Sequence, residues 1–309
     1  MPSTVFVRFE SPAPVPANPR RLHAAVSSVF DLPEGLSAAR AASLPVFAHR
    51  PPHESAGPKP YCLGELSYAD GLFGMEIRFL DDRLVDTLDA WLAWGGVLRI
   101  GSGGEDTVLL AAVDGQVIEH QSWEELAECT EDTTWEIHLV TPTVFSSRGQ
   151  HVWGVSPASL ATSLQERWWH THRASAPGRV DREAMARVLT TYDETRQVPV
   201  SLGMPRSDRR GRLASRTIIA CEGRMRVSGP AASPLTRVFS QLMALSRFTN
   251  VGSHANFGMG VIDAIAVDLG AERQADTIYA SESSKLSIEP SMGVAKKSTP
   301  PFGCRHNLR

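Results

Sequence analysis

Residues 248–260 read FTNVGSHANFGMG and join an apolar helical pattern to an apolar strand pattern. Glycines stand at 252, 258 and 260, and Asn250 comes two residues before the first of them. Glycine adopts positive φ and lets another backbone approach closely, and asparagine is the next most tolerant residue. The stretch therefore predicts a tight loop between a helix and a strand. This loop is either a nest of backbone amides that binds an anion or only a helix cap with a strand bulge.

The elements around this loop follow the order β-α-β-β-α-β. Two Ser-Pro pairs predict helix starts, because serine caps a helix and proline is tolerated at its first position. Strand patterns cover 134–145, 197–204, 215–227 and 260–267, helices begin at Ser156 and Ser233, and a helical insertion covers 182–192.

The first half of the chain repeats that order. Strand patterns cover 5–10, 60–68, 72–80 and 97–101, and helices begin at Asn18 and at Asp81 or Asp82. Two such units in tandem predict an α+β fold of two ferredoxin-like (RRM-like) domains, each an antiparallel sheet with helices on one face. We place these domains at residues 1–128 and 129–270. Residues 271–309 are rich in Ser, Lys and Pro without periodicity, which predicts a flexible tail.

The composition is typical of a soluble globular protein, since 42% of the 309 residues are hydrophobic and 21% are charged. No apolar run approaches the ~20 residues needed to span a membrane. The N-terminus lacks the pattern of a signal peptide. The four cysteines are far apart and form no metal-binding pair. These features predict a cytoplasmic protein with free thiols, no bound metal and no cofactor.

Formal charge is distributed unevenly along the chain. Residues 1–139 carry 9 Lys or Arg against 21 Asp or Glu, whereas residues 140–270 carry 16 against 9. An anionic partner is therefore expected to bind the second half. From charge alone, solvated arginines explain the asymmetry equally well.

The glycine loop resembles that of the CRISPR-associated RAMP proteins, whose pattern G-x-G-x-x-x-x-x-G-x-G it matches with Asn250 in place of the first glycine. Within them, the chain is similar to the precursor-crRNA-processing endoribonucleases, the Cas-six family. The segments LVTPTVF, SLQERWW and FLDDRLVDTL, which begin at residues 139, 163 and 79, resemble the same family. The resemblance implies RNA contacts in the loop, at Asn250, Gly252, His254, Gly258 and Gly260.

A second motif, HESAGPKPY at residues 53–61, resembles the His-x-x-x-Gly-Pro-Lys segment of some family members, in which the histidine and lysine are catalytic. The resemblance points to His53 and Lys59. RNA can be cut without a metal ion when its own 2′-hydroxyl attacks the adjacent phosphate. That reaction needs proton transfer, which histidine performs near neutral pH, and a cation beside the phosphorane, which lysine supplies.

Other residues compete for these roles. His49 lies four residues before His53, and His23 lies on the first predicted helix. Some family members add a tyrosine on that helix as a proton-transfer partner, and Ser27 or a neighbour is the best-matching place here. The three-residue arrangement of those members is therefore incomplete in this chain.

The basic stretch PRSDRRGRLASR, residues 205–216, lies between two predicted strands of the second half. It forms either a hairpin that binds RNA phosphates or a solvated hairpin tip. Arg224 and Arg226 alternate on the following strand and are expected to share a face. The candidate RNA-binding arginines are Arg206, Arg209, Arg210, Arg212, Arg216, Arg224 and Arg226.

Three functions remain open from the sequence. The resemblance favours a metal-independent endoribonuclease that cuts CRISPR repeat RNA, the precursor crRNA, and that can also associate with other CRISPR effector subunits. A non-catalytic RAMP subunit that binds crRNA would have the same loop, but it would not need His53 and Lys59. An unrelated ferredoxin-like metabolic or ligand-binding protein would not need the basic second half.

Overall fold

Strand β1 (Ser3–Glu10) lies in the middle of the first sheet and alternates between two environments. Val5, Val7 and Phe9 are buried, whereas Arg8 and Glu10 on the other face are exposed. This period-two pattern is typical of a strand with one covered face. All pairings in the sheet are antiparallel, in the order β2-β3-β1-β5-β4. The other strands are β2 (Tyr61–Ala69), β3 (Leu72–Phe79), β4 (Val97–Ile100) and β5 (Val108–His120).

The computed structural model describes residues 1–11, 15, 18–53, 58–101, 107–147, 150–152, 154–203, 206–207, 213–214 and 217–267. Residues Met1–Val267 form one compact unit. The predicted tail at 271–309 lies outside the described residues. Among those described, no helix is both long and apolar enough to cross a bilayer.

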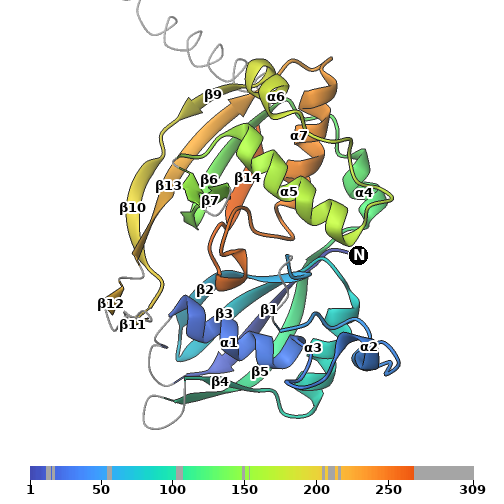
Figure 1. Ribbon diagram of the computed structural model, residues 1–309, viewed down its shortest axis with the longest axis vertical. Coiled ribbons are helices and arrows are strands. Elements are labelled where there is room, and N and C mark those ends of the chain that lie inside the picture. Colours follow the sequence, from blue (N-terminus) through green and yellow to red (C-terminus); the bar gives the residue numbers. More distant parts are fainter. Residues whose placement is uncertain are drawn as a thin grey trace, which may run out of the picture. The chain divides into compact units, whose positions relative to one another are not determined.

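Helices α1 (Pro19–Phe30) and α3 (Arg83–Ala93) pack on one face of the first sheet (Figure 1). Both helix starts were predicted. The Asn18 side chain accepts a hydrogen bond from the amide of Arg20 at 3.0 Å. Asp82 is the N-cap residue of α3 but makes no capping hydrogen bond with its side chain; the Asp81 side chain accepts one from the amide of Arg83 at 3.1 Å. The short helix α2 (Ala38–Ala41) lies between α1 and β2 in the chain.

The strand that closes the first sheet differs from the prediction. In a ferredoxin-like unit the fourth strand, here residues 97–101, pairs with the first, but β4 lies at the sheet edge, and the unpredicted β5 pairs with β1. Register shifts interrupt the β1–β5 pairing. Apolar residues on the exposed face, such as Leu109 and Val113, also remove the alternation that marks a strand in a sequence.

The second sheet has the predicted ferredoxin-like order, β10-β13-β6-β14, and all of its pairings are antiparallel. One difference lies in the insertion at 182–192, where the helix ends at Val188. A strand with β-branched and aromatic residues follows and pairs with β13. The strands are β6 (Thr134–Thr143), β9 (Thr190–Asp193), β10 (Arg196–Ser201), β13 (Thr217–Ser228) and β14 (Ile262–Ala266), with two small hairpins, β7 (Phe145–Ser147) with β8 (Gln150–Val152) and β11 (Arg206–Ser207) with β12 (Leu213–Ala214).

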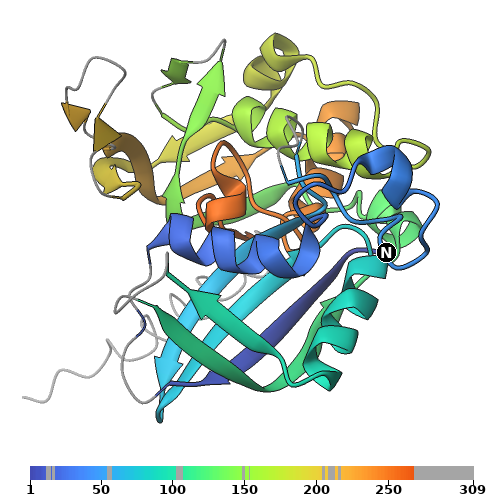
Figure 2. The ribbon, with the colours of Figure 1, turned by 60° about the horizontal axis from the view of Figure 1, so that its bottom comes forward.

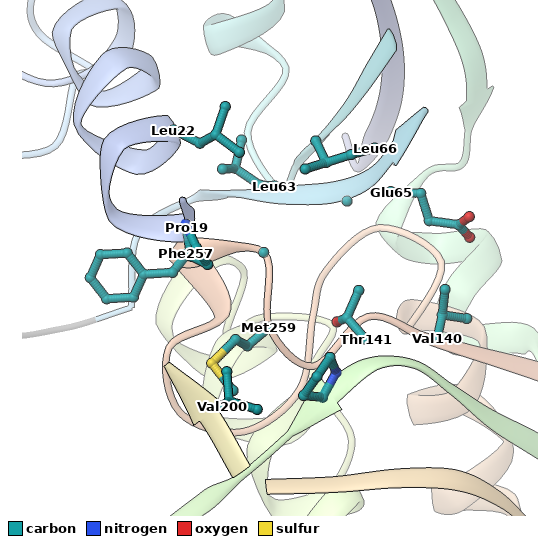
Figure 3. A pocket seen from close by; sticks show the side chains of 13 residues that line it. Pro19, Leu22, Leu63, Glu65, Leu66, Val140, Thr141, Val200, Phe257 and Met259 are labelled. Atoms are coloured by element: carbon teal, nitrogen blue, oxygen red, sulfur yellow. The ribbon is translucent and has the colours of Figure 1, made fainter. Parts of the chain in front are cut away.

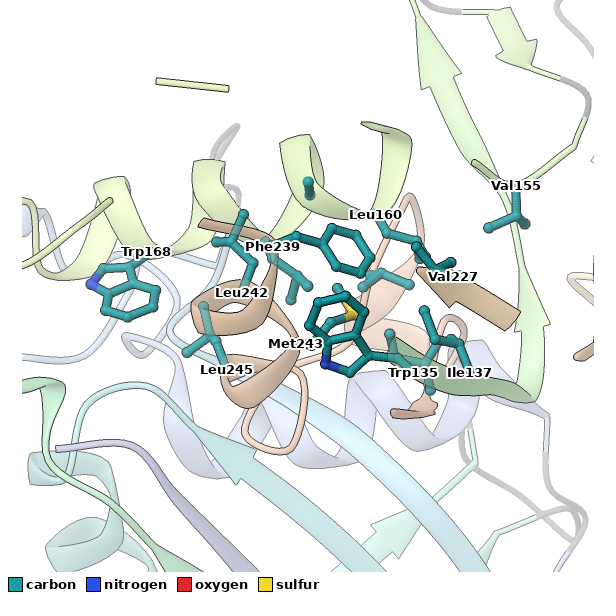
Figure 4. Close-up of a cluster of buried hydrophobic side chains, with 14 of the residues drawn as sticks. Trp135, Ile137, Val155, Leu160, Trp168, Val227, Phe239, Leu242, Met243 and Leu245 are labelled. Carbon is teal, nitrogen blue, oxygen red and sulfur yellow. The ribbon is translucent and has the colours of Figure 1, made fainter. Parts of the chain in front are cut away.

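Helices pack on this sheet around a core of large side chains (Figure 4). Trp135 on β6 contacts Phe239 edge-to-face, with ring centroids 4.9 Å apart, and Trp168 is fully buried. Trp123 belongs to the same core, although its helix precedes the predicted domain boundary at residue 128. The helices are α4 (Trp123–Glu128), α5 (Pro157–Thr171), α6 (Arg182–Val188), α7 (Pro234–Leu245) and the 3-10 turn η2 (Ala255–Phe257).

The segment between α7 and the glycine loop packs against the first sheet. Arg78 on β3 is buried and donates a hydrogen bond to the carbonyl of Ser246 at 3.2 Å. The hydroxyl of Thr4 on β1 donates one to the carbonyl of Arg247 at 3.0 Å. These contacts fix the start of the glycine loop beside strands of the first half of the chain.

Candidate active site

Residues of the motif at 53–61 meet at the buried carboxylate of Asp31, which directly follows α1. The Asp31 side chain is 2% exposed. His53 Nδ1 lies 3.0 Å from its Oδ2, and the Lys59 ammonium forms an ion pair with the same oxygen. The Tyr61 hydroxyl donates to Oδ1 at 2.7 Å. We call Asp31, His53, Lys59 and Tyr61, together with Ser27, the Asp31 cluster.

Lys59 lies inside the protein rather than at its surface. Its side chain is 4% exposed, and its ammonium contacts the Asp31 carboxylate. A buried charge is tolerated when an opposite charge and hydrogen bonds compensate for the lost hydration. Lys59 and Asp31 therefore hold each other in the interior, and in this arrangement the ammonium does not reach into the cleft that His53 lines.

His53 has the opposite environment, since its side chain is 63% exposed. It lines an open cleft of about 820 Å³ together with Ser27, Asp31 and Glu34. Because Nδ1 faces the Asp31 carboxylate, which only accepts hydrogen bonds, this nitrogen carries the proton in the neutral ring. The lone pair of Nε2 is then available to abstract a proton from a bound group.

Two buried hydroxyls extend the cluster along α1. The Ser27 hydroxyl lies 3.1 Å from that of Tyr61 and 3.4 Å from the His23 ring. Burial and the Asp31 charge raise the pKa of Tyr61, so its phenol stays protonated near neutral pH. The tyrosine hydroxyl of this cluster thus comes from β2 rather than from the first helix, and it is enclosed by the protein.

The competing histidines are less suited to proton transfer. Burial, followed by the nearby Lys59 charge, lowers the pKa of His23 to about 4, so this ring is neutral and weakly basic at neutral pH. His49 Nε2 lies 3.0 Å from the Thr87 hydroxyl on α3, and burial lowers the pKa of this histidine as well. His49 is therefore held at α3 and makes no hydrogen bond with the Asp31 cluster.

Asp31 and Tyr61 were not predicted as site residues. Tyr61 lies in a strand that was predicted, and Asp31 directly follows the last residue of α1. Their contact across 30 residues of chain depends on how α1 packs on β2, which no local pattern encodes. The available signal was an acidic residue at the C-terminal end of a predicted helix. A carboxylate there is unfavourable with the helix dipole, so its presence calls for another reason.

The glycine loop is closely packed at two of its glycines. Gly252 and Gly260 have φ values of +74° and +73°. A Cβ would lie 2.3 Å from the carbonyl oxygen of Val144 at the first position and 1.9 Å from that of Val251 at the second. A side chain at either position would therefore displace the backbone, which explains the glycines.

Most of the loop amides are used within the protein, so they do not support the anion-binding nest, which was one of the two alternatives. Gly252 donates to the Ser163 hydroxyl at 2.8 Å, and Gly260 donates to a backbone carbonyl at 3.1 Å. Ser253 and Gly258 also donate to backbone carbonyls. The helix-cap-and-bulge alternative describes these amides better.

Asn250 has a structural role instead of the predicted direct contact with RNA. It is completely buried, and its side-chain amide donates to the carbonyls of Leu63, Ala255 and Met259 at 2.7, 3.2 and 3.1 Å. These bonds close the loop and attach it to β2. Gly260 is also buried, whereas Gly252, His254 and Gly258 are partly exposed.

The loop meets the Asp31 cluster through a row of rings. The η2 turn lies against α1 and β2 (Figure 2). Phe257 contacts His23 edge-to-face at a centroid distance of 4.6 Å and lies 5.6 Å from His254, which adopts positive φ. Since His23 also contacts Ser27, side-chain contacts connect the two predicted motifs, which are far apart in the sequence.

An apolar pocket of about 340 Å³ lies between α1 and the glycine loop and is lined in part by Phe257 (Figure 3). Leu22, Leu63 and Leu66 line one side, and Val140 and Met259 line the other. Its described lining contains no lysine, arginine or histidine. The pocket therefore suits an uncharged apolar group better than a phosphate.

The predicted basic surface is only partly described. Arg224 and Arg226 on β13 share a face, as predicted, but Arg224 forms an ion pair with Glu194, and Arg226 lies 2.5 Å from Glu136. Arg209, Arg210, Arg212 and Arg216, and the side chain of Arg206, lie outside the described residues. Among the described residues, no group of three or more His, Cys, Asp or Glu side chains could hold a metal ion.

Comparison with known proteins confirms the resemblance that the sequence indicated. The model of the family described as CRISPR-associated endoribonuclease Cas6 matches residues 137–262. No curated protein matches the chain by sequence.

Solved structures confirm the fold. A Cas6 (TTHB231) product complex is 21% identical, with a TM-score of 0.58 over 86% of this chain and 100% of that one. A second structure, Thermus thermophilus Cas6 (TTHB231), is 19% identical, with a TM-score of 0.54 over 86% of this chain and 98% of that one. A Cas6 (TTHA0078) product complex is 16% identical over 86% and 99%, with a TM-score of 0.60. The two ferredoxin-like units and the Cas6-type fold are thus established.

Proposed function

We propose that this chain, which resembles the Cas6 family in sequence and in fold, is an endoribonuclease that cuts CRISPR repeat RNA. The family match over 137–262 and the similarity to Cas6 product and substrate-mimic complexes support this function. One observation carries the catalytic part. An exposed imidazole, that of His53, is held by a buried carboxylate in an open cleft.

The proposed reaction is transesterification within the RNA. The neutral His53 ring takes the proton of the 2′-hydroxyl at Nε2, and the 2′-oxygen attacks the adjacent phosphorus. The bond between phosphorus and the 5′-oxygen breaks, and this oxygen takes a proton from solvent. The products are a 2′,3′-cyclic phosphate on the upstream RNA and a free 5′-hydroxyl on the downstream RNA. No step in this sequence requires a metal ion.

Lys59 contributes to this proposal as a charge behind the reacting groups. Its ammonium offsets the Asp31 carboxylate, which would otherwise repel the phosphate and its developing negative charge. A fixed positive charge in a region of low dielectric also stabilises the phosphorane more than the bound phosphodiester. Lys59 therefore acts without leaving its ion pair.

The glycine loop and the basic stretch are proposed to hold the RNA on either side of the cut. Phe257 and His254 offer partly exposed rings on which bases can stack. Arg206, Arg209, Arg210, Arg212 and Arg216 are proposed to contact phosphates. Arg224 and Arg226 contribute only if RNA phosphates replace their glutamate partners.

The chemistry is tested with modified RNA. The purified protein is expected to cut its repeat RNA in excess EDTA and to leave a 2′,3′-cyclic phosphate on the upstream product, which mass spectrometry identifies. A single 2′-deoxy substitution at the cut removes the nucleophile, so it should block cleavage while the dissociation constant stays nearly the same. Cleavage of the deoxy substrate, or loss of activity in EDTA that Mg²⁺ restores, would contradict this mechanism.

The basic stretch is tested through the salt dependence of binding. Affinity should fall by ~0.7 log units per log unit of salt for each phosphate that is neutralised. Replacing Arg209, Arg210 and Arg212 together by Ala should therefore weaken binding and flatten this slope. Arg8→Ala is the control, because Arg8 lies in the acidic half and is paired with Asp114. An unchanged slope in the triple variant would indicate a solvated hairpin tip.

A further inference from the structure

Asp31 neither gives nor takes a proton in the reaction proposed above, yet it is the centre of the cluster. It is 2% exposed, and three donors, from His53, Lys59 and Tyr61, converge on its two oxygens. A carboxylate at the C-terminal end of a helix is electrostatically unfavourable, and so is its burial. An apolar residue after α1 would fill the same space at lower cost, so stability alone does not account for Asp31.

Resting on the function proposed above, we infer that Asp31 is a positioning residue that fixes both the orientation and the tautomer of His53. Its carboxylate accepts a hydrogen bond from Nδ1–H, which leaves Nε2 as the basic nitrogen. Without this acceptor, a histidine that is 63% exposed would populate both tautomers and several rotamers. Only part of that population would present a lone pair to the 2′-hydroxyl.

Asp31 cannot itself be the base that contacts RNA. Its Oδ2 is shared by His53 and Lys59, and its Oδ1 accepts from Tyr61. Asp31 and His53 both line the cleft, but the Asp31 side chain is 2% exposed, whereas that of His53 is 63% exposed. A proton from a bound hydroxyl therefore reaches His53 first, and Asp31 acts through that ring.

The other members of the cluster compensate the charge of the carboxylate and hold it in place. The Lys59 ammonium compensates its charge, and the Tyr61 hydroxyl, which lies 3.1 Å from that of Ser27, fixes its second oxygen to α1. This division of roles predicts different effects for different variants. Loss of the carboxylate changes the state of His53, whereas loss of the tyrosine hydroxyl removes one bond to the carboxylate and leaves the acceptor for Nδ1–H present.

The first test measures the tautomer directly and needs no RNA. In wild-type protein labelled with ¹⁵N-histidine, long-range ¹H–¹⁵N NMR spectra of His53 in its neutral state should show a protonated Nδ1 and an unprotonated Nε2. Asp31→Asn should shift the ring toward the other tautomer or a mixture, because an amide can donate to Nδ1 as well as accept from it. Tyr61→Phe is the matched control and should retain the wild-type tautomer.

The second test measures the chemical step. In single-turnover reactions at saturating protein, Asp31→Asn should slow cleavage by about 10–10³-fold with RNA affinity within about twofold of wild type. The rate should also be measured as a function of pH. The described titratable groups around His53 are His23, Asp31, Glu34, Lys59 and Tyr61. The pH at which the rate rises should move in Asp31→Asn and stay in place in Tyr61→Phe.

Asp31→Asn also leaves the buried Lys59 without a counter-ion, so this variant can fail to fold. In that case Asp31→Asn combined with Lys59→Met removes both charges and permits the same NMR measurement. A folded variant with the wild-type tautomer, or Asp31→Asn with the wild-type rate and pH profile, would overturn the inference. If the wild type never cuts RNA, the proposed function fails, and the NMR result alone decides whether Asp31 controls His53.

Discussion

His53→Ala is expected to slow cleavage of repeat RNA by about 10²–10⁴-fold, the range typical for loss of a positioned general base. RNA affinity should change little, because His53 is one exposed side chain in a cleft of about 820 Å³ and its main partner is protein. Single-turnover rates at saturating protein separate this effect from binding and product release. A uniform loss of affinity with an unchanged rate would instead make His53 an RNA-binding residue.

His49→Ala and His23→Ala are the matched controls for this variant. His49 is held by Thr87 on α3, so its loss should leave the rate within a few-fold of wild type. His23 contacts Ser27 and Phe257, so its loss should weaken RNA binding more than the chemical step. Loss of cutting in His49→Ala but not in His53→Ala would mean that the motif alignment is wrong by four residues. Tight binding without any cutting by the wild type would favour the non-catalytic RAMP subunit.

The fold was predictable from the sequence because its signals are local. Caps such as Ser156 and Ser233, the apolar spacing of the helices and the alternation in β1 each depend on neighbours within one or two turns. The strand β5 was missed for the converse reason. Its register shifts and its apolar residues on the exposed face come from tertiary context, which overrides the local pattern.

The site was predictable only as separate motifs. The His53 motif and the glycine loop were both identified, but their contact through His23 and Phe257 depends on how the segment after α7 packs on the first sheet. The same limit applies to charge. Counting arginines predicted a positive face on β13, whereas Glu194 and Glu136, which belong to other strands or loops, neutralise Arg224 and Arg226. Sequence composition gives the total charge, and pairing in space decides how much of it is available to RNA.

Lys59→Met is expected to lower the free energy of unfolding by about 3–5 kcal/mol, the usual cost of leaving one charge of a buried pair without its partner. Methionine retains most of the side-chain volume, so the loss would come from the uncompensated Asp31 carboxylate rather than from a cavity. Urea unfolding measured at neutral pH gives this quantity directly.

An exposed ion pair provides the control for this variant. Arg224→Met removes the cation that is paired with Glu194, and such exposed pairs contribute little to stability because water and salt screen them. Combining Lys59→Met with Asp31→Asn should restore much of the lost stability, because neither charge then remains buried alone. The restored protein should still cut RNA slowly, since it lacks both the charge behind the phosphate and the carboxylate that fixes the tautomer of His53. Equal stability losses in Lys59→Met and Arg224→Met would contradict this account, because they would mean that Lys59 reaches solvent and that the buried pair does not form.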